Sequence, residues 1–369
     1  MKAFLPAAAL LTGALLVAPP SQAAKTAPSK AASQDKVYRL DRVTSLKGKA
    51  PGWDYLTLDP AHGGLYIGRR AGGVTVYDVR NHAVVGQVAN SAGANIGLPL
   101  PQLGKGFTAN GDGSTTVFDL ATLKASKRVK LGDGADAVFF DPASGQLMFT
   151  LGDSQRLAFM DSKTDTVSGY LHLDSTQIEG VAPDTHGAAF VALRDKDQVA
   201  KVDVKRRALI AAWPVTGCQQ PTSVAYDAVH DRVFVGCKGD QPVLAVLDGA
   251  RGAVVAKLEI GRGNDGVKFE GGKIYASNGV DGNITVFDQL GPDQYRLEQA
   301  VTTRPIARTM AIDPASKRIW TVTAEGMVDP SRPVNRRAAP FYPNQYFDDT
   351  FVLLEYGLHP KPTAAVEED

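Results

Sequence analysis

The sequence has few cysteines and no excess of charge of either sign. Its 369 residues include two cysteines, which excludes a disulfide-dense framework or a multi-cysteine metal centre. Lys plus Arg number 40 and Asp plus Glu number 39, so no global field attracts nucleic acid or an anionic membrane. The HExxH and GxSxG motifs are also missing, and the six histidines form no metal signature. No reaction is therefore indicated by a short motif.

Long hydrophobic runs are missing as well. The longest candidate, Ala7 to Ala18, spans 12 residues and is shorter than the roughly 20 that a membrane helix needs. Lys2 precedes this run and Ser21-Gln22-Ala23 follows it, which is typical of an export signal peptide over residues 1–23; a membrane anchor is the alternative. We expect residues 24–36 to be a flexible leader and the mature protein to be periplasmic, without a membrane span.

What fills the rest of the chain is a series of short runs of β-branched and aromatic residues. Residues 52–88 contain four of them, YLTL, LYIG, VTVYD and AVVGQV, divided by the turn signals DPAHGG, RRAGG and VRNH. Short strands bounded by Gly, Pro, Asn and Asp are typical of consecutive β-hairpins. Four antiparallel strands that recur at a fixed period predict one blade of a β-propeller.

The period is visible in the polar or charged residue near the start of each first strand. Successive members of this series are 41, 41, 43, 43, 43 and 43 residues apart. The series consists of Asp54, Asn95, Asp136, Glu179, Thr222, Asp265 and Arg308. The third strands repeat too, as VTVYD, TTVFD, LAFMD, VAKVD, LAVLD and ITVFD, followed by FVLLEY. The sequence therefore predicts an all-β fold, a seven-bladed β-propeller of four-stranded antiparallel blades in a single domain over residues 37–357.

The last repeat has three strands and no fourth. Residues 37–46, VYRLDRVTSL, form an apolar–polar alternation that has no partner of its own before the first blade. We expect this N-terminal strand to join the last blade, close the ring and remove its open edges. Residues 358–369 then form a polar C-terminal tail.

Several segments resemble a known family. The third-strand patterns TVFDLATLK and FMDSKTDTV resemble the YVTN-type repeat of YncE-like exported seven-bladed propellers, related in plan to WD40 repeats. GKGFTANGDGSTTVFDLATLK, VFVGCKGDQPVLAVLDG and IARTMAIDPASKRIW resemble the second, fifth and last blades of that family. The resemblance covers roughly residues 37–357 and departs in blade 4 and in the long insertion of blade 7. It implies a fold and an exported location, but no activity and no catalytic residues.

In a propeller, the loops that enter the inner strands form one face around a central channel. We expect the series from Asp54 to Arg308 to converge there, with Trp53 offering a stacking surface. Four carboxylates beside one Arg repel one another, by about 2 kcal/mol per pair at 8 Å and an effective dielectric near 20. A bound cation, Arg308 or protonation of one member must offset this. The alternative is that these side chains cap backbone amides and bind each other.

Residues at the ends of the second strands face the same opening. We expect them to form a rim that suits a zwitterionic or peptide ligand, although a solvated rim and, for the Asn-Gly pairs, simple turns are alternatives. The rim candidates are Arg69, Asn110, Arg194, Lys238, Asn278 and Glu325, with Arg70 beside the first.

Cys218 precedes the inner strand of blade 5 and Cys237 ends the next strand, so the hairpin returns one toward the other. Export favours a disulfide between them. A redox or metal-binding thiol pair is the alternative, but the CxxC spacing is missing.

Two functions remain open. The first is a periplasmic binding propeller, a monomer, that holds a small ligand, a cation or a peptide or protein partner on the channel face. The insertion at residues 325–350, rich in Arg and aromatics, is either a partner contact or packing across the ring closure. The second is a lactonase-type hydrolase with a divalent cation held by Glu179, Asp265 and Asn278. The cofactor is otherwise unknown, and nucleic acid is the weakest partner.

Overall fold

Each repeat forms four strands that pair with one another in chain order, from the channel outward. The middle strands are almost entirely buried because both of their faces pack against neighbouring blades. In β19 (Arg232–Cys237), every residue after Arg232 is buried. The outermost strands face solvent on one side, and in β5 (Ala83–Gln87) four of the five residues are exposed. Burial on one or both faces thus explains why the third-strand repeats are easy to recognise and the fourth strands are not.

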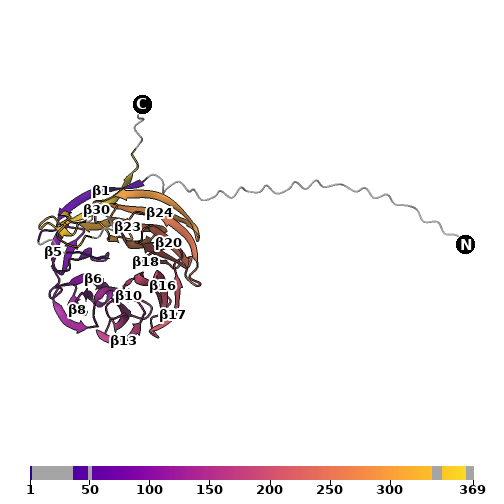
Figure 1. Cartoon of the computed structure of the whole chain (residues 1–369), viewed down its shortest axis with the longest axis horizontal. Helices are drawn as coiled ribbons and strands as arrows, with labels where there is room; N and C mark the ends of the chain where they lie inside the picture. The colour runs from indigo at the N-terminus through magenta and orange to yellow at the C-terminus, as the bar shows by residue number, and fades with distance from the viewer. Residues whose placement is uncertain (2–35, 49–51, 335–342, 363–369) are drawn as a thin grey trace, which may run out of the picture.

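Seven of these four-stranded antiparallel sheets are arranged as a ring, the seven-bladed β-propeller that the sequence predicts (Figure 1). The computed structural model describes residue 1 and residues 36–48, 52–334 and 343–362. The predicted signal peptide and most of the leader and tail lie outside these described residues. Within the described ranges, no helix is long and apolar enough to cross a membrane.

The first four blades follow one plan, with strands listed from the inside outward. Blade 1 contains β2 (Leu56–Asp59), β3 (Gly64–Gly68), β4 (Val74–Asp78) and β5. Blade 2 contains β6 (Ala94–Leu100), β7 (Lys105–Asn110), β8 (Ser114–Asp119) and β9 (Ala125–Lys130), with the 3-10 turn η1 (Pro101–Leu103). Blade 3 contains β10 (Ala135–Asp141), β11 (Gln146–Leu151), β12 (Arg156–Asp161) and β13 (Thr166–His172). Blade 4 contains β14 (Ile178–Pro183), β15 (Ala188–Leu193), β16 (Gln198–Asp203) and β17 (Ala208–Pro214), with η2 (Arg194–Lys196).

The remaining blades follow the same plan until the last. Blade 5 contains β18 (Pro221–Asp227), β19, β20 (Val243–Asp248) and β21 (Val254–Glu259). Blade 6 contains β22 (Asn264–Glu270), β23 (Lys273–Asn278), β24 (Asn283–Gly291) and β25 (Gln294–Thr302). Blade 7 contains β26 (Met310–Ile312), β27 (Ile319–Thr323), β30 (Val352–Pro360) and β1 (Lys36–Ser45). A two-stranded sheet, β28 (Gly326–Met327) and β29 (Gln345–Tyr346), lies in the blade 7 insertion.

The N-terminal strand closes the ring, as the sequence predicts. β1 is the outermost strand of blade 7 and pairs antiparallel with β30, from Lys36 opposite Pro360 to Ser45 opposite Val352. The pairing continues past the strand, where the backbone N–H of Leu46 donates to the carbonyl of Phe351 at 2.8 Å. Two chain ends more than 300 residues apart are thereby held in one sheet, and β30 is paired along both of its edges.

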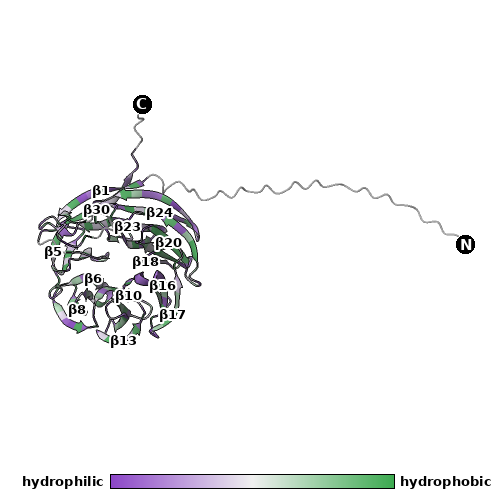
Figure 2. Cartoon of the chain, in the orientation of Figure 1, coloured by the Kyte–Doolittle hydropathy of each residue, from purple (hydrophilic) through white to green (hydrophobic). Residues whose placement is uncertain are grey.

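The core lies between the blades rather than in one place, and hydrophobic residues accordingly occur all around the ring (Figure 2). One cluster joins Phe159 of blade 3 to Val191 of blade 4. The cluster at the closure joins Leu65 of blade 1 to Trp320 and Phe351 of blade 7. Each blade therefore depends on its neighbours for burial of both faces, which makes ring closure a condition of stability.

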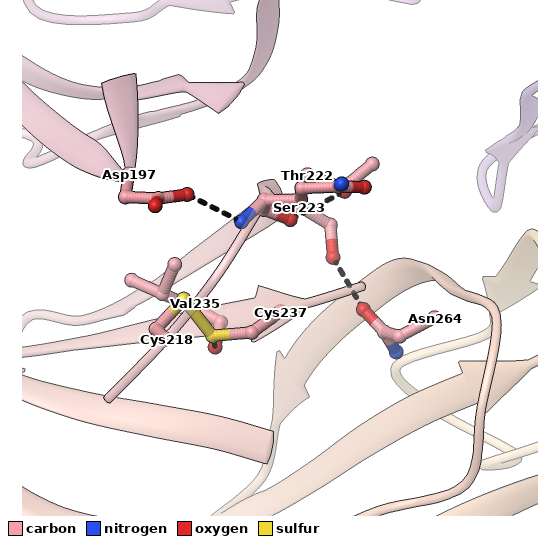
Figure 3. The surroundings of a disulfide bond; sticks show 8 residues. Asp197, Cys218, Thr222, Ser223, Val235, Cys237 and Asn264 are labelled. Carbon is pink, nitrogen blue, oxygen red and sulfur yellow. Dashed lines mark hydrogen bonds between the residues drawn. A yellow bond between two sulfur atoms is a disulfide. The ribbon is translucent and has the colours of Figure 1, made fainter. Parts of the chain in front are cut away.

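Cys218 and Cys237 form the predicted disulfide in blade 5, with their Cα atoms 5.4 Å apart (Figure 3). Both cysteines are buried. The bond ties the loop that leads into β18 to the end of β19, one residue before Lys238. The two mouth-facing ends of this hairpin are therefore covalently joined.

We expect removal of β1 to prevent stable folding, because it would expose the edge of β30 and the buried ring of Tyr38, whose hydroxyl lies 3.0 Å from that of Tyr275. The substitution Tyr38→Ala alone should lower the free energy of unfolding by about 3–5 kcal/mol, as for other buried aromatic residues. Urea denaturation followed by circular dichroism measures this. Deletion of ten residues from the leader, residues 24–33, is the matched control, and a β1 deletion that melts like this control would contradict the closure.

Reduction of the disulfide should lower the free energy of unfolding by about 3 kcal/mol, since the bond closes a loop with a sequence separation of 19. The double variant Cys218→Ala, Cys237→Ala should show a similar loss and no further response to reductant. Denaturation with and without reductant, with the thiol state checked by mass spectrometry, tests this. Equal midpoints for the oxidised and fully reduced protein would show that the bond does not stabilise the fold.

Candidate functional site

The inner strands bring most of the predicted series together at one end of the channel, which we call the mouth. A cavity of about 530 Å³ lies there, and Asn95, Asp136 and Glu179 line it together with Arg70 and Arg194. Arg308 extends the cluster across the opening: its guanidinium lies 3.6 Å from the Asp54 carboxylate and 3.4 Å from that of Asp265. Thr222 donates to the backbone carbonyl of Gln220 and makes no contact with the charged members.

A β-bulge explains how the backbone presents these side chains. In blades 2 to 6, the pairing of the innermost strand with its neighbour skips the residue of the series, so that this residue has no partner across the ladder. The skipped residues are Asn95, Asp136, Glu179 with Gly180, Thr222 and Asp265. In blades 1 and 7, Asp54 and Arg308 lie just before β2 and β26. Each blade thus supplies one residue that is free of the sheet pattern.

Cations from the second-strand ends neutralise most of the carboxylates. Arg70 donates to Asp54 at 2.6 Å, Arg194 to Glu179 at 3.2 Å, and Lys238 to Asp265 at 2.8 Å. Arg194 and Lys238, two of the predicted rim residues, thus pair with carboxylates of the series. Burial opposes ionisation of Asp265, but Lys238 and Arg308 outweigh it, and the pKa of this carboxyl is lowered.

Asp136 is the carboxylate that these cations do not reach. Among the described residues, its direct polar partner is the side-chain amide of Asn95, which donates to it at 2.9 Å. Burial and the neighbouring carboxylates of Asp54 and Glu179 raise its pKa well above the usual range, and the charge of Arg70 only partly opposes them. The corresponding second-strand end in blade 3 carries Asp153 in place of a cation. Blade 3 therefore presents to the mouth a carboxyl group that no Lys or Arg side chain pairs with among the described residues.

Trp53 does not offer a stacking surface at the mouth. It is 2% exposed and packs edge-on against Tyr346 at 5.0 Å and against Phe351 at 5.3 Å. Its backbone carbonyl, rather than its ring, takes part in the site by accepting a hydrogen bond from Arg308. The described part of the insertion, through Tyr346, thus packs across the ring closure.

Two predicted rim residues are buried inside their hairpins. The amide of Asn110 donates to Ser114 and Thr116, and its oxygen accepts from Thr108. Asn278 makes the corresponding bonds to Asn283 and Thr285 in blade 6. Both side chains are 0% exposed, because they satisfy the backbone and hydroxyl groups of the Asn-Gly turn region rather than face the opening.

The predicted metal-binding set is therefore not brought together. The side chain of Asn278 is occupied within blade 6, its amide also donating to the backbone of Ala276, while Glu179 and Asp265 are paired with Arg194 and Lys238. Within the described residues, no group of three or more His, Cys, Asp or Glu side chains is placed to hold a metal ion.

The remaining rim predictions are also displaced from the mouth. Arg69 is 8% exposed and lies over the ring of Phe351 at 4.7 Å, with its guanidinium donating to the carbonyl of Lys47. Glu325 is exposed and lines a different cavity of about 580 Å³, beside Arg304 and Phe347. Arg70, which the sequence analysis names beside Arg69, lines the mouth cavity in its place.

Comparisons with known proteins support the architecture. No protein-family model matches the sequence, and no curated protein matches it. Among solved structures, hydrazine synthase of Kuenenia stuttgartiensis is similar with a TM-score of 0.65 and 16% identity, over 75% of this chain and 94% of that chain. A chain of a mitotic checkpoint complex is similar with a TM-score of 0.69 and 11% identity, over 94% of this chain and 99% of that one. At these identities the likeness shows the propeller fold alone.

The charges at the mouth predict that two matched substitutions, Asp136→Asn and Asp265→Asn, change the stability of the fold in opposite directions. In the unfolded chain, both Asp136 and Asp265 titrate near the ordinary pKa of about 4. The folded state raises the pKa of Asp136, so ionisation of this group destabilises the fold as the pH rises above that value. The folded state lowers the pKa of Asp265, so its ionised form adds stability that is lost as the pH falls through the folded pKa.

At pH 7, Asp136→Asn should therefore raise the melting temperature and Asp265→Asn should lower it. At pH 3, below the unfolded pKa of Asp, the gain for Asp136→Asn should disappear and the loss for Asp265→Asn should shrink. Thermal melts of the two variants and the parent at both pH values measure this. A lower melting temperature for Asp136→Asn at pH 7 would refute the assignment of a carboxyl group without a paired cation to blade 3.

Proposed function

We propose that this chain is an exported, YncE-like binding propeller that holds a small zwitterionic ligand or a peptide at the mouth. The observation that carries the proposal is Asp136. This carboxylate lines the mouth cavity, and among the described residues no Lys, Arg or His nitrogen lies within 4.0 Å of it. A buried carboxylate without a counter-ion costs free energy, and a ligand cation in contact with it recovers that cost.

An ammonium group fits this position better than a metal ion does. Asp136 and Asn95 together offer three side-chain oxygens, whereas a divalent cation such as Ca²⁺ takes six or more. An ammonium needs few acceptors and carries a single charge. The proposed contact is a charge-assisted hydrogen bond from the ligand ammonium to the Asp136 carboxylate.

The flanks of the same cavity suit a negatively charged group of the ligand. Arg70 and Arg194 line it, and their side chains remain 47% and 28% exposed although each is paired with a carboxylate. Guanidinium groups bind planar carboxylates in a forked geometry, and each of these two has N–H donors left for a ligand. A ligand with an ammonium group and a carboxylate, such as an amino acid or a short peptide, would therefore use both parts of the mouth.

The proposed location rests on two independent features. Disulfides form and persist in oxidising compartments, and the buried Cys218–Cys237 bond supports export on that ground. The pattern at residues 1–23 supports a signal peptide that directs the chain there. We propose residues 37–357 as the propeller domain of the exported protein, acting as a monomer.

The test is isothermal titration of the purified protein with free amino acids and dipeptides, and with the same dipeptides N-acetylated. The acetylated forms lack the ammonium charge and should bind at least tenfold more weakly, since a hydrogen bond between charged groups contributes about 1.5–3 kcal/mol. Asp136→Asn should weaken binding of the free dipeptide to the same extent.

Asp133→Asn is the matched control, because this carboxylate is 77% exposed and does not line the mouth cavity. It should leave the affinity unchanged. Equal binding of free and acetylated dipeptides, or an Asp136→Asn variant that binds as tightly as the parent, would contradict the proposal, as would a failure of every zwitterion to bind.

A further inference from the structure

A second cavity lies deeper in the central channel. Its volume is about 240 Å³, and its walls come from the inner strands of several blades. Most of the lining is apolar, including Leu98, Phe139 and Met310, with Tyr55 among them. Two of its lining residues are charged, Asp265 on the mouth side and Lys268. Asp265 is already paired with Lys238 and Arg308, so the charge available to this cavity is that of Lys268.

Lys268 is the one charged residue among the seven equivalent inner-strand positions that lie three residues after the mouth series. It lies three residues along β22 from Asp265, and the corresponding positions in the other blades lie three residues along from each mouth residue. Those positions carry uncharged side chains in every case: Thr57, Leu98, Phe139, Ala182, Ala225 and Ala311. One blade out of seven thus places an ammonium at a depth where the others place small, apolar or hydroxyl side chains.

No partner within the described residues neutralises this ammonium. Lys238 and Lys273 each donate to a carboxylate, whereas Lys268 makes no hydrogen bond or ion pair with any described residue. Desolvation by the surrounding protein lowers its pKa, and no neighbouring charge acts to raise it. An ammonium beside mostly apolar walls, without an anion, makes no contact that would explain it as a purely structural residue.

The side chain is nevertheless open to the channel. Lys268 is exposed, and it lines both the central cavity and a further one of about 260 Å³ on its other side. Pro60 and Pro314, in the turns that follow β2 and β26, line that further cavity. The ammonium therefore lies between the central cavity and the face opposite the mouth, where a ligand from that face would meet it.

We propose that the central channel binds a small monocarboxylate with an apolar body, whose carboxylate pairs with Lys268 and whose body packs against Phe139 and Leu98. This site is distinct from the mouth and does not depend on the ligand proposed there. The single cation matches one negative charge on the ligand, and the apolar walls match an apolar remainder of the ligand. A volume of about 240 Å³ is below the 300–1,000 Å³ of sites for drug-sized ligands, which favours a body the size of a phenyl ring or a short alkyl chain.

The surroundings of Lys268 favour a carboxylate over a phosphate. A phosphate dianion is held by several backbone N–H donors or by two or more cations. The cavity offers one unpaired cation, because the lining hydroxyls of Thr57 and Thr309 already donate to the backbone carbonyls of Gly97 and Asp54. A single cation matches the single charge of a carboxylate, whereas a phosphate dianion would need further donors.

The experiment is calorimetric titration of the purified protein with benzoate and hexanoate, and with benzyl alcohol and hexanamide as uncharged counterparts. Benzoate or hexanoate should bind with saturation, at least tenfold more tightly than its uncharged counterpart. Lys268→Met keeps the length and apolar stem of the side chain but removes the charge, and should weaken carboxylate binding at least tenfold. Lys268→Arg keeps the charge and should retain most of the affinity.

Lys257→Met is the matched control, because Lys257 is exposed on β21, away from the channel. Asp136→Asn should also leave benzoate binding unchanged, which separates this site from the mouth. Absence of carboxylate binding, or equal affinity in Lys268→Met, would overturn the proposal.

Discussion

The pairing of β1 with β30 is the interaction on which the rest of the molecule depends. Without it, blade 7 ends in an open edge, and the cluster that joins Leu65 to Trp320 has no fixed geometry. The mouth depends on it as well, since Asp54 and Arg308 stand at opposite ends of the chain and meet only in the closed ring. Thr309 adds to the same junction by donating to the carbonyl of Asp54. Closure is thus a condition of the site and not only of stability.

The seven-bladed ring could be predicted from the sequence because of the repeat. The residues at the mouth could be predicted because of the bulge. A regular spacing of 41 to 43 residues survives only if each repeat occupies an equivalent place in the ring. Because the bulged residue has no ladder partner, its chemistry is free of the sheet pattern, and a polar residue such as Asp136 or Asp265 stands out among apolar neighbours. Six of the seven series residues take part in the charged and amide contacts at the mouth; Thr222 is the exception.

The rim and stacking predictions failed at positions where a shift of one residue along the chain changes the direction in which the side chain points. Arg69 and Arg70 are adjacent, but one packs over Phe351 and the other reaches Asp54. Consecutive side chains of an extended segment point to opposite sides, so a shift of one residue selects the wrong face. Trp53 packs into the ring closure, whereas the side chain of Asp54 beside it reaches Arg70 and Arg308 at the mouth. Whether Asn278 faced solvent or its own hairpin depended on the hydroxyl of Thr285 across the turn, a contact that spacing alone does not give.

The residue at the head of each inner strand, bulged in blades 2 to 6, also separates the chemistry of the mouth from the pairing of the strands. A substitution of its side chain changes what the mouth can bind without changing the register of the sheet. Because seven such positions can vary independently, the same backbone can carry many different combinations of side chains at the mouth. A shared propeller therefore implies nothing about a shared ligand, and relatives of this chain with the same function should be sought by the identity of these seven residues.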